Sequence, residues 1–151
     1  MSDAATAQEI TIRRVLDAPR EVVWKAWTEA DQIAEWWGPP GWKSPRERIT
    51  MDVRPGGVFR VVSISDAEGT QMPVEGVYRE VEPPERLVYE EPVEGAWHEG
   101  AVSVATFTDL GDGRTELVVR TTIHTTEELR AQAEAGMAAT FDRFAEYVES
   151  R

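Results

Sequence analysis

The first residues of the chain alternate between apolar and polar side chains and then change to a helical pattern. Residues 9–17, EITIRRVLD, are rich in β-branched side chains and partly alternate, which is typical of a strand. Pro19 is suited to the first turn of a helix. Val23 and Trp27 stand four positions apart, and Trp24 and Trp27 three apart, so this helix would have one strongly apolar face.

A second short helix is expected directly after the first. It would begin at Thr28, with Asp31 three positions later in an approximate capping box, and it would end at Gly38. Trp36 and Trp37 would then lie at the end of a helix and not in a free loop.

The part of the chain between residues 46 and 123 has the alternation and the turn sequences of a series of strands. Two of these strands are joined by Gly111-Asp112-Gly113, a good hairpin signal. The other turns, breaks and loops are expected at Pro55-Gly56-Gly57, residues 65–69, Pro83-Pro84 and residues 92–100. On the last strand, one face is shared by Leu117, Val119, Thr121 and Ile123.

Residues 125–150 have the pattern of one long amphipathic helix. Thr125 or Thr126 can cap it, and the acidic residues of its first turn suit the helix dipole. One stripe of this helix carries Met137, Thr140, Phe141, Phe144 and Val148.

The order of these elements predicts an α+β fold. One amphipathic helix cannot cover a flat sheet of six or seven strands, so we expect a strongly curved antiparallel sheet around the C-terminal helix. The two short helices after the first strand would close one end, and the space between sheet and helix would form a cavity. Residues 9–149 would make one domain, preceded by a flexible N-terminus at residues 1–8.

The composition is that of an ordinary globular domain, with 41% hydrophobic and 29% charged residues in a chain of 151. The absence of cysteine excludes disulfides, zinc thiolates and a thiol nucleophile. The sequence has no apolar run long enough to span a membrane, and its first residues do not resemble a secretory signal, so a cytoplasmic location is expected.

The formal net charge of −12 argues against one class of partner. A negative field repels phosphate backbones. The densest basic stretches, RRVLDAPR and SPRERI, are interrupted by acidic or apolar residues. We therefore expect no binding to nucleic acid.

Several motifs, in this order, carry a family resemblance: DAPREVVWKAWT, EWWGPPGW, RPGG, GVYREVEPPERLVYE and FDRFAEYVE. With them the chain resembles the SRPBCC superfamily of START-like, helix-grip proteins, and within it the group related to the activator of heat shock protein 90 ATPase. The resemblance covers residues 9–149 and implies the helix-grip fold. It implies no single activity, because the superfamily includes lipid carriers, hormone receptors, polyketide cyclases and dioxygenase subunits.

The resemblance also implies places for particular residues. Trp24 and Trp27 would pack the first helix on the sheet, and residues 36–39 would form a bend that closes one end of the cavity. Pro40 is an extra residue relative to the family pattern. The separate N-terminal domain with which the eukaryotic activator contacts its chaperone has no counterpart in this sequence. The helix residues that would face the cavity are Met137, Phe141 and Phe144.

Tryptophans are concentrated around one rigid corner of the chain. Residues 36–42 hold three of them around Gly-Pro-Pro-Gly, where they either fill the core or line a pocket for an apolar ligand. Trp42 and Trp97, in loops rich in Gly and Pro, are candidates for the rim of such a pocket. The residues expected to line the cavity are Trp24, Trp27, Trp37, Trp42, Phe59, Tyr78, Tyr89, Val104, Val119, Thr121, Met137, Phe141 and Phe144.

Few polar groups are candidates for the interior. Tyr78 and Tyr89 are attractive, because a phenol tolerates an apolar wall and can orient an oxygen of a ligand. Strand alternation places half of all strand positions outside, so the other candidates are weaker. They are the charged residues Arg60, Glu75 and Arg120, whereas Thr121 ranks with the tyrosines.

The sequence assigns no catalytic residue. The tripeptide Trp97-His98-Glu99 joins a histidine to a carboxylate, but adjacent side chains diverge in an extended segment. His98 and His124 are the only two histidines, and carboxylates are abundant by composition alone. We therefore expect neither a metal ion nor another cofactor.

Together these observations predict a protein that binds a small hydrophobic molecule between the sheet and the C-terminal helix. The ligand would be a lipid, an aromatic or a polyketide-like compound. One alternative is a cyclase or hydrolase in which Tyr78, Tyr89 or His98 positions a proton; a buried polar group with a shifted pKa would favour it. Another is a chaperone-associated or self-associating interaction module, such as a homodimer, which an apolar patch outside the cavity would favour.

Overall fold

A long strand, β1 (Thr6–Leu16), is followed by two short helices, α1 (Arg20–Thr28) and α2 (Ala30–Trp36). The computed structural model describes residues 6–91 and 100–150. The last element is the long helix α3 (Glu127–Glu149). Between α2 and α3 lie the 3₁₀ helix η1 (Arg46–Arg48) and the strands β2 (Trp42–Lys43), β3 (Ile49–Met51), β4 (Val58–Ser65), β5 (Gln71–Glu82), β6 (Arg86–Glu91), β7 (Ala101–Gly111) and β8 (Arg114–Thr125).

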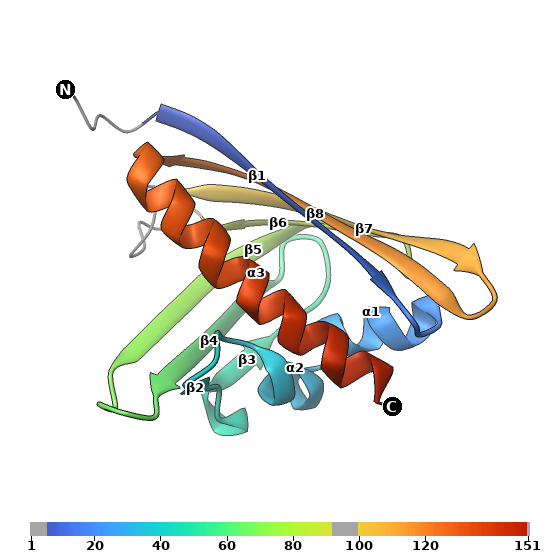
Figure 1. Cartoon of the computed structure of the whole chain (residues 1–151), viewed down its shortest axis with the longest axis horizontal. Coiled ribbons are helices and arrows are strands. Elements are labelled where there is room, and N and C mark those ends of the chain that lie inside the picture. Colours follow the sequence, from blue (N-terminus) through green and yellow to red (C-terminus); the bar gives the residue numbers. More distant parts are fainter. Residues whose placement is uncertain (1–5, 92–99, 151) are drawn as a thin grey trace.

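The strands form one antiparallel sheet in the order β1-β8-β7-β6-β5-β4-β2, and β3 also pairs with β4. Figure 1 shows this sheet curving around α3, with α1 and α2 lying toward the C-terminal end of that helix. The α+β fold and the gripped helix are therefore confirmed. The described residues form eight strands where six or seven were predicted. A strand was expected in the stretch that holds β3, whereas β2 has only two residues and leaves no alternating pattern.

The first strand begins earlier than predicted. Thr6, Ala7 and Gln8 pair with residues 123–125 of β8, so the sheet includes residues that the sequence placed in a flexible N-terminus. The pairing of β1 with β8 is long and regular, and it continues to Leu16 opposite Thr115.

The boundary between α1 and α2 also differs from the prediction. Thr28 was expected to cap the second helix, but it is the last residue of α1, and its Oγ1 donates to the Trp24 carbonyl at 2.8 Å. Glu29 occupies the N-cap position of α2, with an extended backbone and no side-chain hydrogen bond to the helix. Asp31 pairs with Arg46 instead of completing a capping box. The predicted end of α2 at Trp36 and Trp37 is confirmed.

The long helix α3 packs its apolar stripe on the concave face of the sheet. Its N-cap is Thr126, one of the two predicted residues, whose side chain accepts from Leu129 N at 3.2 Å. Phe141, Phe144 and Val148 are buried, and Met137 and Thr140 are half-buried at the edge of the stripe. Among the described residues, no helix combines the length and the apolarity needed to cross a bilayer.

Alternation along the strands decides which side chains meet α3. On β8 the buried positions are every second residue, and the residues between them are exposed or half-buried. The predicted shared face is thus confirmed, and it looks toward α3 and α1. Its buried members are Thr115, Leu117, Val119, Thr121, Ile123 and Thr125.

Gly76 on β5 lies opposite Phe59 on β4, and alanine at this position is expected to destabilise the fold. A Cβ atom at residue 76 would lie 2.4 Å from Phe59 Cζ and 2.6 Å from the Glu90 carbonyl oxygen. Overpacking of this kind costs about 1–3 kcal/mol. The urea midpoint of Gly76→Ala should fall accordingly.

Gly136→Ala is the matched control, since nothing lies within 4 Å of a Cβ added at that position of α3. Alanine is favoured over glycine inside a helix by about 0.5–1 kcal/mol, so this variant should gain stability. A Gly76→Ala protein as stable as the wild type would contradict the described packing of Phe59.

Candidate ligand-binding site

Trp27 of α1 is the centre of the aromatic core. Its ring lies 5.1 Å from Trp36, 5.4 Å from Phe141, 5.2 Å from Phe144 and 6.2 Å from Phe107, measured between centroids. Four elements therefore meet on this one side chain, which is only 3% exposed. Most of the space between the sheet and the helices is filled by these rings.

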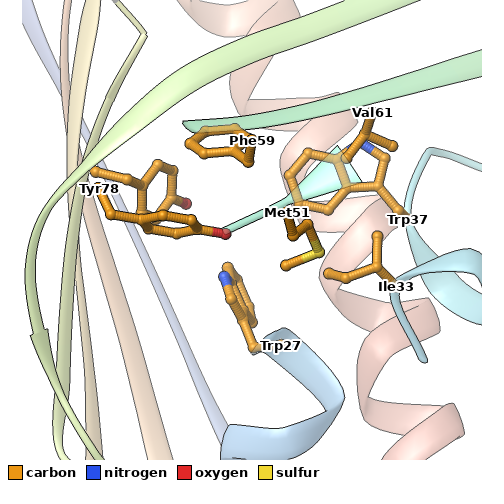
Figure 2. Close-up of a pocket in the computed structure, with 8 residues that line it drawn as sticks. Trp27, Ile33, Trp37, Met51, Phe59, Val61 and Tyr78 are labelled. Carbon is orange, nitrogen blue, oxygen red and sulfur yellow. The ribbon is translucent and has the colours of Figure 1, made fainter. Parts of the chain in front are cut away.

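A small cavity remains beside Trp27, with a volume of about 20 Å³. A cavity needs about 10–15 Å³ by this measure to hold one water molecule, so this one has room for about one. Figure 2 shows Tyr78 and Trp37 on opposite sides of the cavity, with Phe59 above it and Trp27 below. The lining residues that the structure describes are Trp27, Ile33, Trp37, Met51, Phe59, Val61, Tyr78 and Tyr89.

Two tyrosines supply the polar groups of this wall. Tyr78 on β5 and Tyr89 on β6 are paired residues of the sheet, and the Phe59 ring lies 5.1 Å from the first and 5.7 Å from the second. No hydrogen bond joins the Tyr78 hydroxyl to any residue that the structure describes. Among the described residues the Tyr78 hydroxyl is therefore a donor without a partner, in a lining that is otherwise mostly apolar.

Burial keeps both phenols neutral. It raises the pKa of Tyr78, and the neighbouring Tyr89 raises this pKa further. Burial also raises the pKa of Tyr89; Glu91 adds to that effect and the Ser103 hydroxyl opposes it. At neutral pH each group is an uncharged phenol that can donate a hydrogen bond.

The hydroxyl groups continue across the sheet beyond the cavity. Tyr89 pairs with Ser103, and Ser103 pairs with Thr121, on adjacent strands. Ser103 Oγ and Thr121 Oγ1 are 2.8 Å apart and hydrogen-bonded in the core. Thr121 thus lies on the concave face, as predicted, but two strands away from Tyr89 and outside the cavity lining.

The predicted cavity residues divide into three groups. Those that line the cavity are Trp27, Trp37, Phe59, Tyr78 and Tyr89. Those that are buried in the core around it are Trp24, Val119, Thr121, Phe141 and Phe144. Those outside the lining and only half-buried are Trp42, Val104 and Met137.

The placement predicted for Val104 needs correction. Ser103 and Ala105 are buried on the concave face of β7, so the pleat directs Val104 to the opposite face. Arg60 and Glu75 form an exposed ion pair at 3.2 Å, and Arg120 is also exposed, so these candidates do not reach the cavity either.

Sequence reasoning missed three lining residues: Ile33, Met51 and Val61. Two of them have a detectable signal, because Ile33 lies one helical turn before Trp37 and Val61 lies two residues after Phe59 on the same strand. Met51 has none, since β3 is too short to show a period.

The predictions for Trp97 and His98 lie outside the described residues. Within residues 6–91 and 100–150, no group of three or more His, Asp or Glu side chains has the proximity needed to hold a metal ion. The described part of the cavity wall carries aromatic, aliphatic and phenolic groups.

Comparison with known proteins identifies the family. Residues 17–149 match the family described as "Activator of Hsp90 ATPase homolog 1-like protein". The chain belongs to this family. The predicted resemblance to the SRPBCC group related to that activator is thereby confirmed.

Solved structures share the fold. An AHSA1-like protein from Aeromonas hydrophila is 26% identical, with a TM-score of 0.78 over 95% of this chain and 93% of that chain. Protein CV1439 from Chromobacterium violaceum is 24% identical, with a TM-score of 0.80 over 94% and 98%. CalU16 from Micromonospora echinospora is 22% identical, with a TM-score of 0.71 over 96% and 82%. No match was found among curated proteins.

The raised pKa values of the two cavity tyrosines can be tested by alkaline titration. The chain has three tyrosines. In the folded state, the wild type and a Tyr78→Phe/Tyr89→Phe variant should show the same tyrosinate absorbance up to a pH of about 11, because Tyr78 and Tyr89 remain protonated. In urea, the tyrosinate absorbance of the wild type should exceed that of the variant by the contribution of two tyrosines.

The same shift makes stability depend on pH. These phenols have folded pKa values above the unfolded value of about 10, so their contribution is complete below that pH and is lost as pH rises toward the folded values. A larger tyrosinate signal from the folded wild type than from the variant near pH 10 would contradict the buried placement.

Proposed function

We propose that this chain binds a small neutral molecule, apolar except for one hydrogen-bond acceptor, in the cavity between the sheet and the helices. The Tyr78 hydroxyl carries this proposal, because it lines the cavity with no partner among the described residues and is available as a donor to a ligand acceptor. The surrounding aromatic and aliphatic side chains suit an apolar ligand body.

The charge of the site favours a neutral ligand over an anion. Every lining residue that the structure describes is uncharged, and the chain as a whole carries −12. A carboxylate in this cavity would lose its hydration without gaining a cation. Ketones, esters, lactones and ethers fit these requirements, whereas the corresponding acids do not.

The alternatives depend on other features. Within the described lining, the titratable groups open to a cyclase or hydrolase are the two phenols. Their raised pKa values suit them to donate to a carbonyl oxygen and not to act as bases. An interaction module would need an apolar surface patch. The large apolar side chains that are exposed in the described part are Val15, Val58, Val102 and Leu110, on three different strands.

A pair of isosteric probes tests the role of Tyr78. Acetophenone and α-methylstyrene have the same shape, but only the first has a carbonyl acceptor. Tyr78→Phe should lower the affinity for acetophenone about fivefold, which corresponds to one net hydrogen bond. The affinity for α-methylstyrene should be nearly unchanged. The measurement is the titration shift of the Met51 methyl resonance, since Met51 lines the cavity.

Tyr147→Phe is the control for loss of a phenol elsewhere, because Tyr147 donates to Gln32 Oε1 at 3.2 Å and is not a lining residue. It should bind both probes as the wild type does. Equal losses of both probes in Tyr78→Phe, or no Met51 shift with either probe in the wild type, would contradict the proposed site.

A further inference from the structure

The cavity is too small for any ligand of the proposed class as it stands. Its volume of about 20 Å³ holds about one water molecule, so a molecule such as acetophenone can enter only if part of the wall moves. This inference rests on the proposed function. The contacts of the wall residues indicate which part of the wall moves.

The sheet side and α1 are the least movable parts. Phe59, Tyr78 and Tyr89 project from β4, β5 and β6, each of which is paired on both sides. Trp27 contacts four other rings of the core. Displacing any of these side chains would disrupt sheet pairing or the aromatic core.

The segment of residues 37–42, here named the Trp37 loop, brings Trp37 to the wall from outside the helices and the long strands. Trp37 is half-buried, and its one ring contact among the described residues is with Trp36, at 5.5 Å. Gly38 and Gly41 have φ values of 103° and 91°, which favour glycine. The strand that follows, β2, pairs with β4 through two residues only.

One side chain of α3 holds both ends of the Trp37 loop. Arg143 Nη1 donates to the carbonyl oxygens of Gly38 at 2.6 Å, Pro39 at 3.3 Å and Trp42 at 3.3 Å. No carboxylate pairs with Arg143 among the residues that the structure describes. The guanidinium group therefore bonds to this loop, which lies more than a hundred positions earlier in the sequence.

Other elements also bond to this segment: Trp37 N donates to the Ile33 carbonyl of α2 at 3.0 Å, and Trp42 pairs with Ser65 of β4. The Gly41 carbonyl accepts from Asp66 N at 2.9 Å, and the Trp37 carbonyl accepts from Ser44 Oγ at 2.9 Å. Asp66 directly follows β4, whereas Ser44 is buried and its Oγ lies 2.8 Å from Ser63 Oγ of β4, so the Ser44 bond connects the start of the segment to the sheet. Arg143 is the tie between the Trp37 loop and the rigid helix.

We propose that the Trp37 loop is the gate of the cavity and that Arg143 holds it closed. Loss of the guanidinium removes charge-assisted hydrogen bonds to three carbonyls, so the open state should become about tenfold more populated. Ligand would then enter and leave faster, while the closed complex keeps the same contacts with Tyr78 and Trp27.

Methyl relaxation dispersion without ligand tests the gate directly. In protein labelled at methionine methyl groups, Arg143→Met should increase exchange at Met51, which lines the cavity. Met137, on the same helix as Arg143 but outside the lining, should be unchanged. Arg143→Lys, which keeps the charge but lacks the planar fork, should show a smaller increase and is available if Arg143→Met does not fold.

Arg14→Met is the matched control. Arg14 also binds α3, donating to Asp142 Oδ1 at 3.1 Å and to the Ala138 carbonyl at 3.3 Å, but it does not touch the Trp37 loop. It should leave Met51 exchange as in the wild type. Equal effects of the Arg14 and Arg143 variants on Met51, or a change at Met137 alone, would overturn the gate.

Acetophenone exchange rates, measured from Met51 line shapes, separate this proposal from the proposed function. Arg143→Met should raise association and dissociation rates together, about tenfold, with little change in Kd. An unchanged association rate would overturn the role of Arg143. Increased Met51 exchange in a protein that binds neither probe would support the gate and contradict the proposed ligand class.

Discussion

The structure depends on how the space inside a strongly curved sheet is filled. α3 presents one narrow apolar stripe, so rings from α1 and α2 must fill what it leaves open. Trp27 does most of this, because its ring meets Trp36, Phe107, Phe141 and Phe144 and so fixes α1, α2, α3 and β7 relative to one another. Interiors pack to near-crystalline density, and large rigid rings rarely fill an irregular space completely. The cavity beside Trp27 is what remains.

The character of the cavity follows from that packing. Its helix side consists of residues that fill the core, and its sheet side holds two phenols whose burial keeps them neutral. Tyr78 has no partner for its hydroxyl within the described residues, so a mostly apolar wall presents this donor to the cavity. The wall opposite the sheet ends in the Trp37 loop, which α3 holds through Arg143. The two proposals thus place recognition on the sheet and access on the Trp37 loop.

The sequence predicted features that depend on local pattern. The gripped helix, its cap at Thr126 and the β7–β8 hairpin follow from periodicity and turn chemistry. The predicted start of α2 was wrong, because Thr28 hydrogen-bonds back to its own helix, α1. The predicted placement of Val104 was wrong, because a shift of one position along a strand moves a side chain to the opposite face. Neither the volume of the cavity nor the role of Arg143 could be predicted. The volume depends on rings from distant elements, and the Arg143 contacts join residues about a hundred positions apart.

The central claim is that a neutral, acceptor-bearing molecule occupies the space between Trp27 and Tyr78. Intermolecular NOEs between the methyl protons of acetophenone and the labelled protein test it most directly. We predict NOEs to the Met51 methyl and to ring protons of Trp27 and Tyr78, all of which line the cavity. NOEs confined to exposed side chains such as Val58 or Val102 would contradict the account, as they lie outside the lining.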